Sequence, residues 1–293
     1  MHIAFIGLGL IGGSVARAVR ANRTDSPWTM SAWSPSGEGP DLALADGIID
    51  RASRTPEDAL AGADLVVLAG PPTACLTALD HFAGRWSTSL GSSTVITDVA
   101  STKAMLLERA DASGLRYVGG HPLAGREVAG YAGGRADLFV DRPWVIVPGR
   151  GAQPADVELV TAFVKTCRAH VVQMDATAHD RAVAGISHLP LILAAALVEA
   201  VAGLEPGDPD GDWPVASALA ASGWRDMTRL ARGDPVMGAG IAVTNGAALA
   251  ERLGDLQRTL DSWREALERP GGPDEAVLAD RLRAARARLE APS

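Results

Sequence analysis

Three glycines near the start of the chain have the spacing of a phosphate-binding turn. Residues 7–12 (GLGLIG) lie between an apolar run of strand length and a helical pattern. The first glycine of such a turn permits a tight bend, the second lets the backbone approach a pyrophosphate, and the third lets helix and strand pack closely. The N–H groups at the helix start attract phosphate. We expect a dinucleotide to be bound by the turn residues Gly7, Leu8, Gly9, Leu10, Ile11 and Gly12.

The end of the second expected strand bears on the choice of dinucleotide. A site that prefers NAD usually has Asp or Glu here, to accept hydrogen bonds from the ribose hydroxyls. This chain has Ser34 and Ser36 at these positions, so a 2′-phosphate would meet no carboxylate there. The sequence therefore favours NADP over NAD. No arginine lies in the same loop to pair with the phosphate, and nothing in the sequence shows that Arg51 or Arg54 reaches it.

Two further segments place polar side chains at the ends of expected strands. Residues 97–103 (TDVASTK) follow an apolar strand, and residues 119–127 (GGHPLAGRE) present His121 in a loop bounded by glycines. Ligands of open α/β sheets bind at the carboxyl ends of the strands. We therefore expect Asp98 and Ser101 to contribute to the cofactor site and His121 to lie at the same edge.

Polar pairs also occur in the second half of the chain. His179 and Asp180 begin a long apolar helical pattern, and His188 follows about two helical turns later. Arg225 and Arg229 lie one helical turn apart and share a helix face. The formal net charge of the chain is -8, so an anionic small-molecule substrate would need such a local basic cluster.

Short β-rich runs alternate with helical patterns through the first half of the chain. The expected strands are residues 2–6, 29–33, 65–69, 95–98, 117–119, 144–147 and 171–174, and expected helices include residues 10–21, 56–61 and 73–83. Strands that alternate with helices imply a parallel sheet covered on both faces. We expect an α/β, Rossmann-like dinucleotide-binding domain over residues 1–174.

After residue 174 the pattern is helical throughout. Residues 178–203 form one long apolar pattern, expected to be kinked or broken at Pro190, and its polar residues indicate a buried helix and not a membrane span. The pattern at residues 274–290 predicts a last helix that buries four apolar side chains, Val277, Leu278, Leu282 and Leu289. Residues 175–293 are expected to form an all-helical domain that binds substrate and, because little sheet covers its apolar helices, dimerises.

Composition excludes several classes of partner. Hydrophobic residues make up 47% of the chain and charged residues 21%, which is typical of folded protein, and the acidic balance disfavours nucleic acid and anionic membranes. Cys75 and Cys167 lie far apart in apolar stretches, which indicates buried free thiols and a cytoplasmic location. A strand pattern at the N-terminus leaves no room for a signal peptide. The remaining histidines have no metal-ligand spacing, so no metal site is expected.

Five motifs, taken in this order, resemble the prephenate/arogenate (cyclohexadienyl) dehydrogenase family. They are GLGLIGGS at residues 7–14, DVASTK at 98–103, GGHPLAGRE at 119–127, HDRAVAGISHLP at 179–190 and WRDMTRLA at 224–231. The resemblance covers residues 1 to about 245, and GGHPLAGRE is its most specific part. It implies a Rossmann-like domain followed by a helical dimerisation domain, a homodimer, and NAD(P)-dependent oxidative decarboxylation of prephenate or arogenate, as in tyrosine biosynthesis.

The resemblance also implies residue roles at the reacting centre. His121 would hydrogen-bond the ring hydroxyl of the substrate and take its proton, a task matched to a neutral imidazole near neutral pH. Ser101 would link His121 to the nicotinamide end of the cofactor. Arg229 would bind a substrate carboxylate through charge-assisted hydrogen bonds, and Asp180 would orient Arg229.

Other implied roles concern the rest of the substrate cleft. Glu127, Arg225 and Asp226 would form ionic contacts at its mouth. His188 is expected to bind substrate, although a histidine on an apolar helix is also compatible with a satisfied core residue.

Two positions depart from the pattern of the family. Leu191 stands where the family commonly has a second histidine (SHLPH), and Gly238 stands where many members have tryptophan. Both changes concern recognition of the substrate and spare the hydride and proton chemistry. Prephenate, arogenate and 4-amino-4-deoxyprephenate therefore all stay open as substrates.

Two other functions stay open. A different two-domain NAD(P)-dependent oxidoreductase, such as a hydroxyacid dehydrogenase or imine reductase, typically relies on a lysine in the first long helix of its second domain, and residues 178–203 contain no lysine. A non-catalytic sensor of the dinucleotide or an aromatic metabolite would need no proton acceptor at His121.

Overall fold

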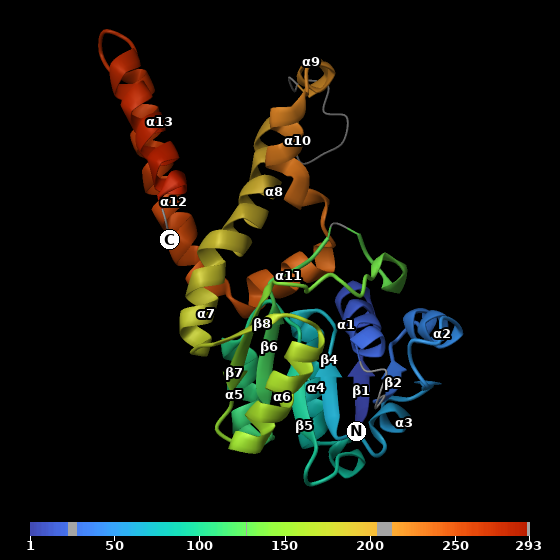
Figure 1. Cartoon of the computed structure of the whole chain (residues 1–293). Coiled ribbons are helices and arrows are strands. Elements are labelled where there is room, and N and C mark those ends of the chain that lie inside the picture. Colours follow the sequence, from blue (N-terminus) through green and yellow to red (C-terminus); the bar gives the residue numbers. More distant parts are fainter. Residues whose placement is uncertain (23–27, 127, 204–212, 292–293) are drawn as a thin grey trace. The chain divides into compact units, whose positions relative to one another are not determined.

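The structure is a computed structural model that describes residues 1–22, 28–126, 128–203 and 213–291 (Figure 1). The chain has two compact units, Met1–Gly246 and Ala247–Ser293. The strands are β1 (His2–Ile6), β2 (Thr29–Trp33), β3 (Arg51–Ala52), β4 (Leu65–Leu68), β5 (Val95–Asp98), β6 (Val118–Pro122), β7 (Pro143–Pro148) and β8 (His170–Gln173).

Helices connect and follow these strands. In the first part of the chain they are α1 (Leu10–Asn22), α2 (Glu38–Ala45), α3 (Pro56–Leu60), α4 (Pro72–Ala83), α5 (Ala104–Ala112) and α6 (Pro154–Thr166), with short 3₁₀ turns η1 (Ser87–Ser89) and η2 (Tyr131–Gly133). After β8 they are α7 (Ala176–Val183), the π turn η3 (Ala184–His188), α8 (Leu189–Ala202), α9 (Trp213–Ala218), α10 (Ser222–Thr228), the 3₁₀ turn η4 (Arg229–Arg232), α11 (Pro235–Thr244), α12 (Gly246–Glu268) and α13 (Glu275–Glu290).

The first sheet has five parallel strands in the order β3-β2-β1-β4-β5. The chain builds outward from β1 through β2 to β3 and then returns to the other side of β1 with β4. The strand order therefore reverses between β1 and β4. In sheets of this kind the crevice at the carboxyl ends of those two strands is the usual ligand site.

The second sheet differs from the expected all-parallel series. Its order is β6-β7-β8, and β6 pairs with β7 in the antiparallel sense, whereas β7 and β8 are parallel. Parallel pairing needs a crossover, usually a helix. The described residues between β6 and β7 contain only the 3₁₀ turn η2, so the chain returns in the opposite direction, whereas α6 supplies the crossover between β7 and β8.

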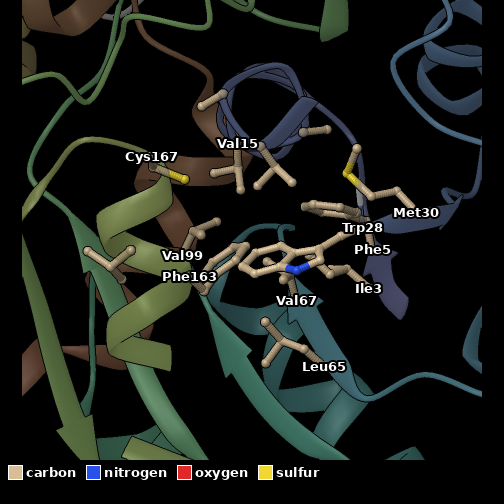
Figure 2. Close-up of a cluster of buried hydrophobic side chains, with 14 of the residues drawn as sticks. Ile3, Phe5, Val15, Trp28, Met30, Leu65, Val67, Val99, Phe163 and Cys167 are labelled. Atoms are coloured by element: carbon tan, nitrogen blue, oxygen red, sulfur yellow. The ribbon is translucent and has the colours of Figure 1, made fainter. Parts of the chain in front are cut away.

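Alternate side chains of the central strands form the two faces of the core. Ile3 and Phe5 of β1 pack with α1 and α6, and Figure 2 shows them in one cluster with Val15 and Phe163. Ala4 and Ile6, one residue out of step, lie in a second cluster with side chains of α3, α4 and α5. This alternation follows from the two-residue period of a strand, and each large aliphatic side chain buried contributes about 1.5–3 kcal/mol.

The long apolar helix after β8 is interrupted as expected, but one turn earlier than Pro190. The backbone is a π turn over Ala184–His188, and Pro190 lies in the first turn of α8. Proline has no N–H to donate to the preceding turn, which it therefore interrupts. Extra residues accommodated in a π turn often mark functional positions.

The expected burial of this helix is not found within a single chain. Among the residues of α8 only Ala194 is buried, and Ile186 in the π turn is 74% exposed. Ala176–Ala202 is long and apolar enough to cross a membrane by length and composition, a test that core helices of other proteins also pass. The described residues therefore leave most of the apolar surface of this helix uncovered.

The C-terminal unit consists of α12 and α13. Asp274 caps α13 by accepting hydrogen bonds from the N–H groups of Ala276 and Val277, and the guanidinium of Arg281 lies 4.1 Å from the ring centre of Trp263. The prediction that α13 buries its apolar side chains is wrong for a single chain. Val277, Leu282 and Leu289 are exposed, and Leu278 is half-buried, because two helices alone cannot enclose them.

Candidate active site

The glycine turn has the geometry that its sequence predicts. Gly7 has a φ of 94°, and a Cβ there would lie 2.8 Å from the carbonyl of Ala69 at the end of β4. A Cβ on Gly12 would lie 2.8 Å from the Cβ of Ala69, so this glycine permits close packing of α1. At Gly9, no atom of the described residues lies within 4 Å of the corresponding point. The turn therefore leaves open space at the residue where a pyrophosphate would approach.

A cavity of about 620 Å³ opens beside this turn. Its walls include Leu8, Gly9, Ser34 and Ser36, whereas Leu10, Ile11 and Gly12 belong to the start of α1 and do not line it. The Oγ atom of Ser34 is buried and has no hydrogen-bond partner in the described part of the chain. Open space at the second glycine and an unsatisfied hydroxyl at the end of β2 both fit a bound dinucleotide.

Asp98 has a different role from the one expected. It is fully buried, and its carboxylate accepts hydrogen bonds from Lys103 Nζ, the Tyr117 hydroxyl and the N–H groups of Ala100 and Gly120. Both oxygens are occupied by protein groups, so the side chain is not available to a cofactor. Asp98 instead joins β5, β6 and the loop before α5.

The buried ion pair between Asp98 and Lys103 affects its neighbours. Burial raises the pKa of the Tyr117 hydroxyl well above its usual value, and the Asp98 charge and hydrogen bond add to this effect. Burial likewise raises the pKa of the Cys75 thiol to about 12. Cys75 and Cys167 are both buried and free, as the sequence predicts. Tyr117 and Cys75 are therefore neutral at physiological pH.

His121 lies at the carboxyl end of β6 in a chain of three buried polar side chains. Its Nδ1 atom is 2.8 Å from Nε2 of His179, and Nδ1 of His179 is 2.7 Å from Oδ1 of Asp180. The exposed fractions are 8% for His121, 1% for His179 and 3% for Asp180. Helix α7 thus brings His179 and Asp180 to the edge of the sheet on which β6 presents His121.

The surroundings of His121 keep its imidazole neutral. Burial is the main cause that lowers its pKa well below 6.5, and the neighbouring His179, Lys103 and His188 lower it further. A neutral imidazole has one nitrogen free to accept a proton. His121 is therefore chemically suited to act as a base near neutral pH.

The carboxylate of Asp180 does not point at an arginine, contrary to the expected orienting role for Arg229. It accepts hydrogen bonds from the backbone N–H groups of Lys103 and Ala104, at 2.8 and 2.9 Å, and from His179. The N–H groups at the start of α5 lack partners within the helix and attract a carboxylate. Asp180 therefore anchors the histidine pair to α5.

His188 is buried in the π turn. Its Nδ1 atom lies 3.1 Å from the side-chain nitrogen of Asn245, which also donates to the carbonyl oxygen of Asp180 at 2.8 Å. The Nε2 atom of His188 is buried and has no hydrogen-bond partner in the ranges that the structure covers. Burial lowers the pKa of His188 to about 4. A neutral imidazole with one unsatisfied ring nitrogen is suited to bind a ligand.

The remaining expected site residues are less closely connected. Ser101 follows β5 and is half-buried, and no hydrogen bond joins it to His121. Arg225 in α10 and Arg229 in η4 are exposed, on elements that pack against α8. Glu127 lies outside the described residues. The structure thus brings His121, Asp180 and His188 together, and the expected ionic contacts at the mouth stay a prediction because Glu127 is not among the described residues.

The two positions that depart from the family pattern face one another. A Cβ built on Gly238 would lie 3.5 Å from Cδ2 of Leu191. The leucine therefore packs over α11 at the position where Gly238 has no side chain. The two substituted positions are therefore neighbours in the structure.

Sequence reasoning missed several residues that build the site. His179 was assigned no role because it lacks metal-ligand spacing. It directly precedes Asp180, however, and a neighbouring His-Asp pair at the start of a helix is a signal in the sequence that could have identified it. Asn245 and the hydrogen bond between Thr102 and Thr244, 2.8 Å long, join α11 to the site. Contacts between residues so far apart in sequence leave no local signal.

Together, the parallel sheet with its glycine turn and the buried histidines at the edge of the sheet define a dinucleotide-dependent dehydrogenase. Residues 15–173 match the family described as "Prephenate dehydrogenase, nucleotide-binding domain", and residues 175–281 match "Prephenate dehydrogenase, dimerization domain". The chain belongs to the prephenate dehydrogenase family. The fold class expected from the sequence, a nucleotide-binding domain with a parallel sheet followed by a helical domain, is confirmed.

Individual relatives agree with this assignment. The chain is 32% identical to prephenate dehydrogenase of Bacillus subtilis (strain 168), over 91% of this chain and 70% of the relative. The structure of Synechocystis arogenate dehydrogenase is similar, with 29% identity, a TM-score of 0.76, and 99% and 100% of the two chains covered.

A second similar structure is prephenate dehydrogenase from Aquifex aeolicus in complex with hydroxyphenyl propionate and NAD+. It covers 99% of this chain and 98% of its own, with 24% identity and a TM-score of 0.86, and supports the shared fold. The activity is that of a cyclohexadienyl dehydrogenase, a decarboxylating NAD(P)-dependent enzyme of the kind used in tyrosine biosynthesis.

Proposed function

We propose that the chain oxidises and decarboxylates prephenate or arogenate with His121 as the base. The observation that carries the proposal is the buried, neutral imidazole of His121 at the carboxyl end of β6. A bound nicotinamide would accept hydride from the ring carbon that bears the hydroxyl. His121 would take the hydroxyl proton, and loss of carbon dioxide would then give an aromatic ring. Aromatisation makes the reaction effectively irreversible.

Other residues would hold the substrate in place for this step. Ser101, at the end of β5, would connect His121 with the nicotinamide end of the cofactor. The buried Nε2 atom of His188 would bind an acceptor oxygen of the substrate, which gives it the partner that it lacks. Arg229 would bind a substrate carboxylate, and Arg225 with Glu127 would lie at the mouth of the cleft.

We further propose that the cofactor is NADP rather than NAD. Ser34 and Ser36 line the cavity at the end of β2, and Nη1 of Arg54 lies 3.5 Å from the point where a Cβ of Gly37 would be. Arg54 therefore stands beside the loop that would meet a 2′-phosphate. It is paired with Asp41 at 3.0 Å, and a bound phosphate would compete for this arginine.

We also propose that the chain forms a homodimer in the cytoplasm. Among the described residues beyond 174, many large apolar side chains are exposed in one chain, including Ile186, Val215, Leu219, Val236 and Val243. A second copy would remove this surface from water. Residues 1–174 would then be the dinucleotide-binding domain, and residues 175–293 the helical domain of substrate binding and dimerisation. Two buried free thiols suit a reducing compartment.

The side chain carried by the substrate ring is the least constrained part of the proposal. Leu191 offers no polar group where the family commonly has a histidine, and Gly238 offers no side chain where many members have tryptophan. Prephenate and arogenate are the proposed substrates, and 4-amino-4-deoxyprephenate is the alternative that these two positions leave open.

The proposal is tested by following reduced nicotinamide spectroscopically with purified protein. Prephenate, arogenate and 4-amino-4-deoxyprephenate are each paired with NAD and with NADP, and His121→Ala is assayed in parallel. Turnover of prephenate or arogenate that the variant lacks supports the proposal. Protein that binds dinucleotide but turns over none of the substrates contradicts it and favours another oxidoreductase or a sensor.

A further inference from the structure

We propose that His179 is a positioning residue that fixes the tautomer of His121 and receives a proton from it during the reaction. The inference rests on the proposed function of His121 as the base. It concerns the direction of the two hydrogen bonds that link His121, His179 and Asp180.

Asp180 sets the direction at the inner end. Both oxygens of its carboxylate accept hydrogen bonds from the backbone N–H groups of Lys103 and Ala104 at the start of α5, at 2.8 and 2.9 Å. A charged carboxylate can only accept hydrogen bonds. The 2.7 Å contact with His179 therefore requires a hydrogen on Nδ1 of His179.

This assignment determines the next hydrogen bond. A neutral imidazole with hydrogen on Nδ1 has a lone pair on Nε2. Nε2 of His179 therefore accepts at 2.8 Å, and Nδ1 of His121 must donate. The lone pair of His121 then lies on Nε2, which makes no hydrogen bond to any described residue and is available to the substrate hydroxyl.

The opposite direction would disable His121. A donor at Nε2 of His179 would require a doubly protonated ring, and His121 would accept through Nδ1 and carry its hydrogen on Nε2. That state puts an extra proton into a buried pair that already has Lys103 and His188 nearby, without any proton acceptor facing the substrate. The carboxylate of Asp180 alone would have to offset this charge.

The same arrangement moves charge during the reaction. When Nε2 of His121 takes the hydroxyl proton, its Nδ1 proton can pass to Nε2 of His179. His121 is then neutral again with hydrogen on Nε2, and His179 is an imidazolium in contact with the Asp180 carboxylate. One proton enters at the substrate and the positive charge ends beside the negative one, so no additional reactant is needed.

The variants that test this inference differ in what they offer to His121. His179→Leu keeps a side chain of moderate size without an acceptor, and His179→Gln keeps an acceptor oxygen within reach. His170→Leu, in β8 with a side chain 69% exposed, is the matched control. We expect His179→Leu to lower kcat by about 10²- to 10⁴-fold with little change in either KM, and His179→Gln to recover at least about tenfold of this loss. The control should match wild type.

A second readout does not depend on turnover. Protein labelled with ¹⁵N in its six histidines reports which ring nitrogen of His121 carries hydrogen, with the His121 signals assigned from His121→Ala. Hydrogen on Nδ1 in wild type, lost from this position in His179→Leu, supports the proposal. Three results would each overturn the proposal. They are hydrogen on Nε2 of His121 in wild type, equal kcat in wild type and His179→Leu, and equal losses of kcat in His179→Leu and His179→Gln. Absence of turnover by wild type with every substrate refutes the proposed function, while the NMR spectrum still decides the tautomer.

Discussion

The side-chain amide of Asn245, at the end of α11, donates to Nδ1 of His188 across 3.1 Å and so assigns the hydrogen of this imidazole to Nε2. The same nitrogen of Asn245 also donates to the carbonyl oxygen of Asp180, which confirms that it is the amide nitrogen and not the oxygen that faces His188. The Nε2–H group of His188 is therefore a buried donor without a partner among the residues that the structure describes. Unsatisfied buried donors are rare in proteins, which supports the proposed role of His188 in binding substrate.

Replacing His188 by Phe should weaken substrate binding. Phe keeps an aromatic ring in the π turn but removes the donor, and a hydrogen bond to a charged oxygen contributes about 1.5–3 kcal/mol. We expect KM for the cyclohexadienyl substrate to rise about tenfold to a hundredfold, with KM for the dinucleotide unchanged. Steady-state kinetics with each substrate varied in turn measures both constants. Unchanged KM for the cyclohexadienyl substrate would show that His188 is a core residue.

Two glycines of the turn should respond differently to alanine. Gly9→Ala has open space around its new Cβ, so the free energy of unfolding should change little, while the affinity for dinucleotide falls at least tenfold because the methyl group meets the pyrophosphate. Gly7→Ala forces a φ of 94° on alanine and a contact of 2.8 Å with Ala69, which should cost about 1–3 kcal/mol of stability. Denaturant unfolding and dinucleotide titration distinguish the two effects. Equal destabilisation by both variants contradicts the assignment.

Removing one charge of the buried Asp98–Lys103 pair should lower the free energy of unfolding more than removing both charges. Lys103→Met leaves a buried carboxylate without its counter-charge, which typically costs about 3–5 kcal/mol. The double variant Lys103→Met/Asp98→Asn removes both charges and should recover part of this loss. Urea unfolding of wild type, the two single variants and the double variant gives the coupling between the sites. Additive losses would show that the pair contributes no coupling.

The local parts of this fold could be predicted from the sequence, and the long-range contacts could not. The glycine turn, β1 and α1 are contiguous, and each carries its own spacing signal. Whether β6 and β7 run parallel or antiparallel depends on how the chain returns between them. Strand propensity does not encode this. Asp98 shows the same limit at the site. Its place at the end of β5 was visible, but its burial by Lys103, Tyr117 and Gly120 depends on packing.

Low pH should lower both the stability of the protein and its catalytic rate. Protonation of His188 and His121 should lower the stability, and protonation of His121 should lower the rate. His188, with a pKa of about 4 when folded against 6.5 as its ordinary value, binds a proton more readily when unfolded. Stability is therefore highest above pH 6.5 and falls as the pH drops from about 6.5 toward 4. His121 has a lowered pKa as well and acts in the same direction. The charged and titratable neighbours of this pair are His179, Lys103 and Asp180.

Two measurements separate these effects. The melting temperature should decrease as the pH is lowered from 6.5. In His188→Phe the melting temperature should depend less steeply on pH over this range, because one of the two titrating groups is gone. The value of kcat should stay constant to below pH 6.5, since His121 remains neutral there, and fall at lower pH. A loss of kcat centred at pH 6.5 in folded protein would mean that His121 is not the base or is not buried during turnover.

Arg54 should determine the preference between the two dinucleotides. Its guanidinium lies beside Gly37 in the loop after β2, and Arg54→Gln removes the charge that would pair with a 2′-phosphate while preserving a hydrogen-bonding side chain. We expect kcat/KM for NADP to fall about tenfold or more and kcat/KM for NAD to stay within about twofold, because a charge-assisted hydrogen bond contributes about 1.5–3 kcal/mol. Arg51→Gln is the matched control, since the guanidinium of Arg51 donates instead to the carbonyl oxygen of Asp58. A preference for NAD in wild type, or equal losses with both dinucleotides in Arg54→Gln, would contradict the proposed use of NADP. In that case Ser34 and Ser36 would bind the ribose hydroxyls of NAD in place of the missing carboxylate.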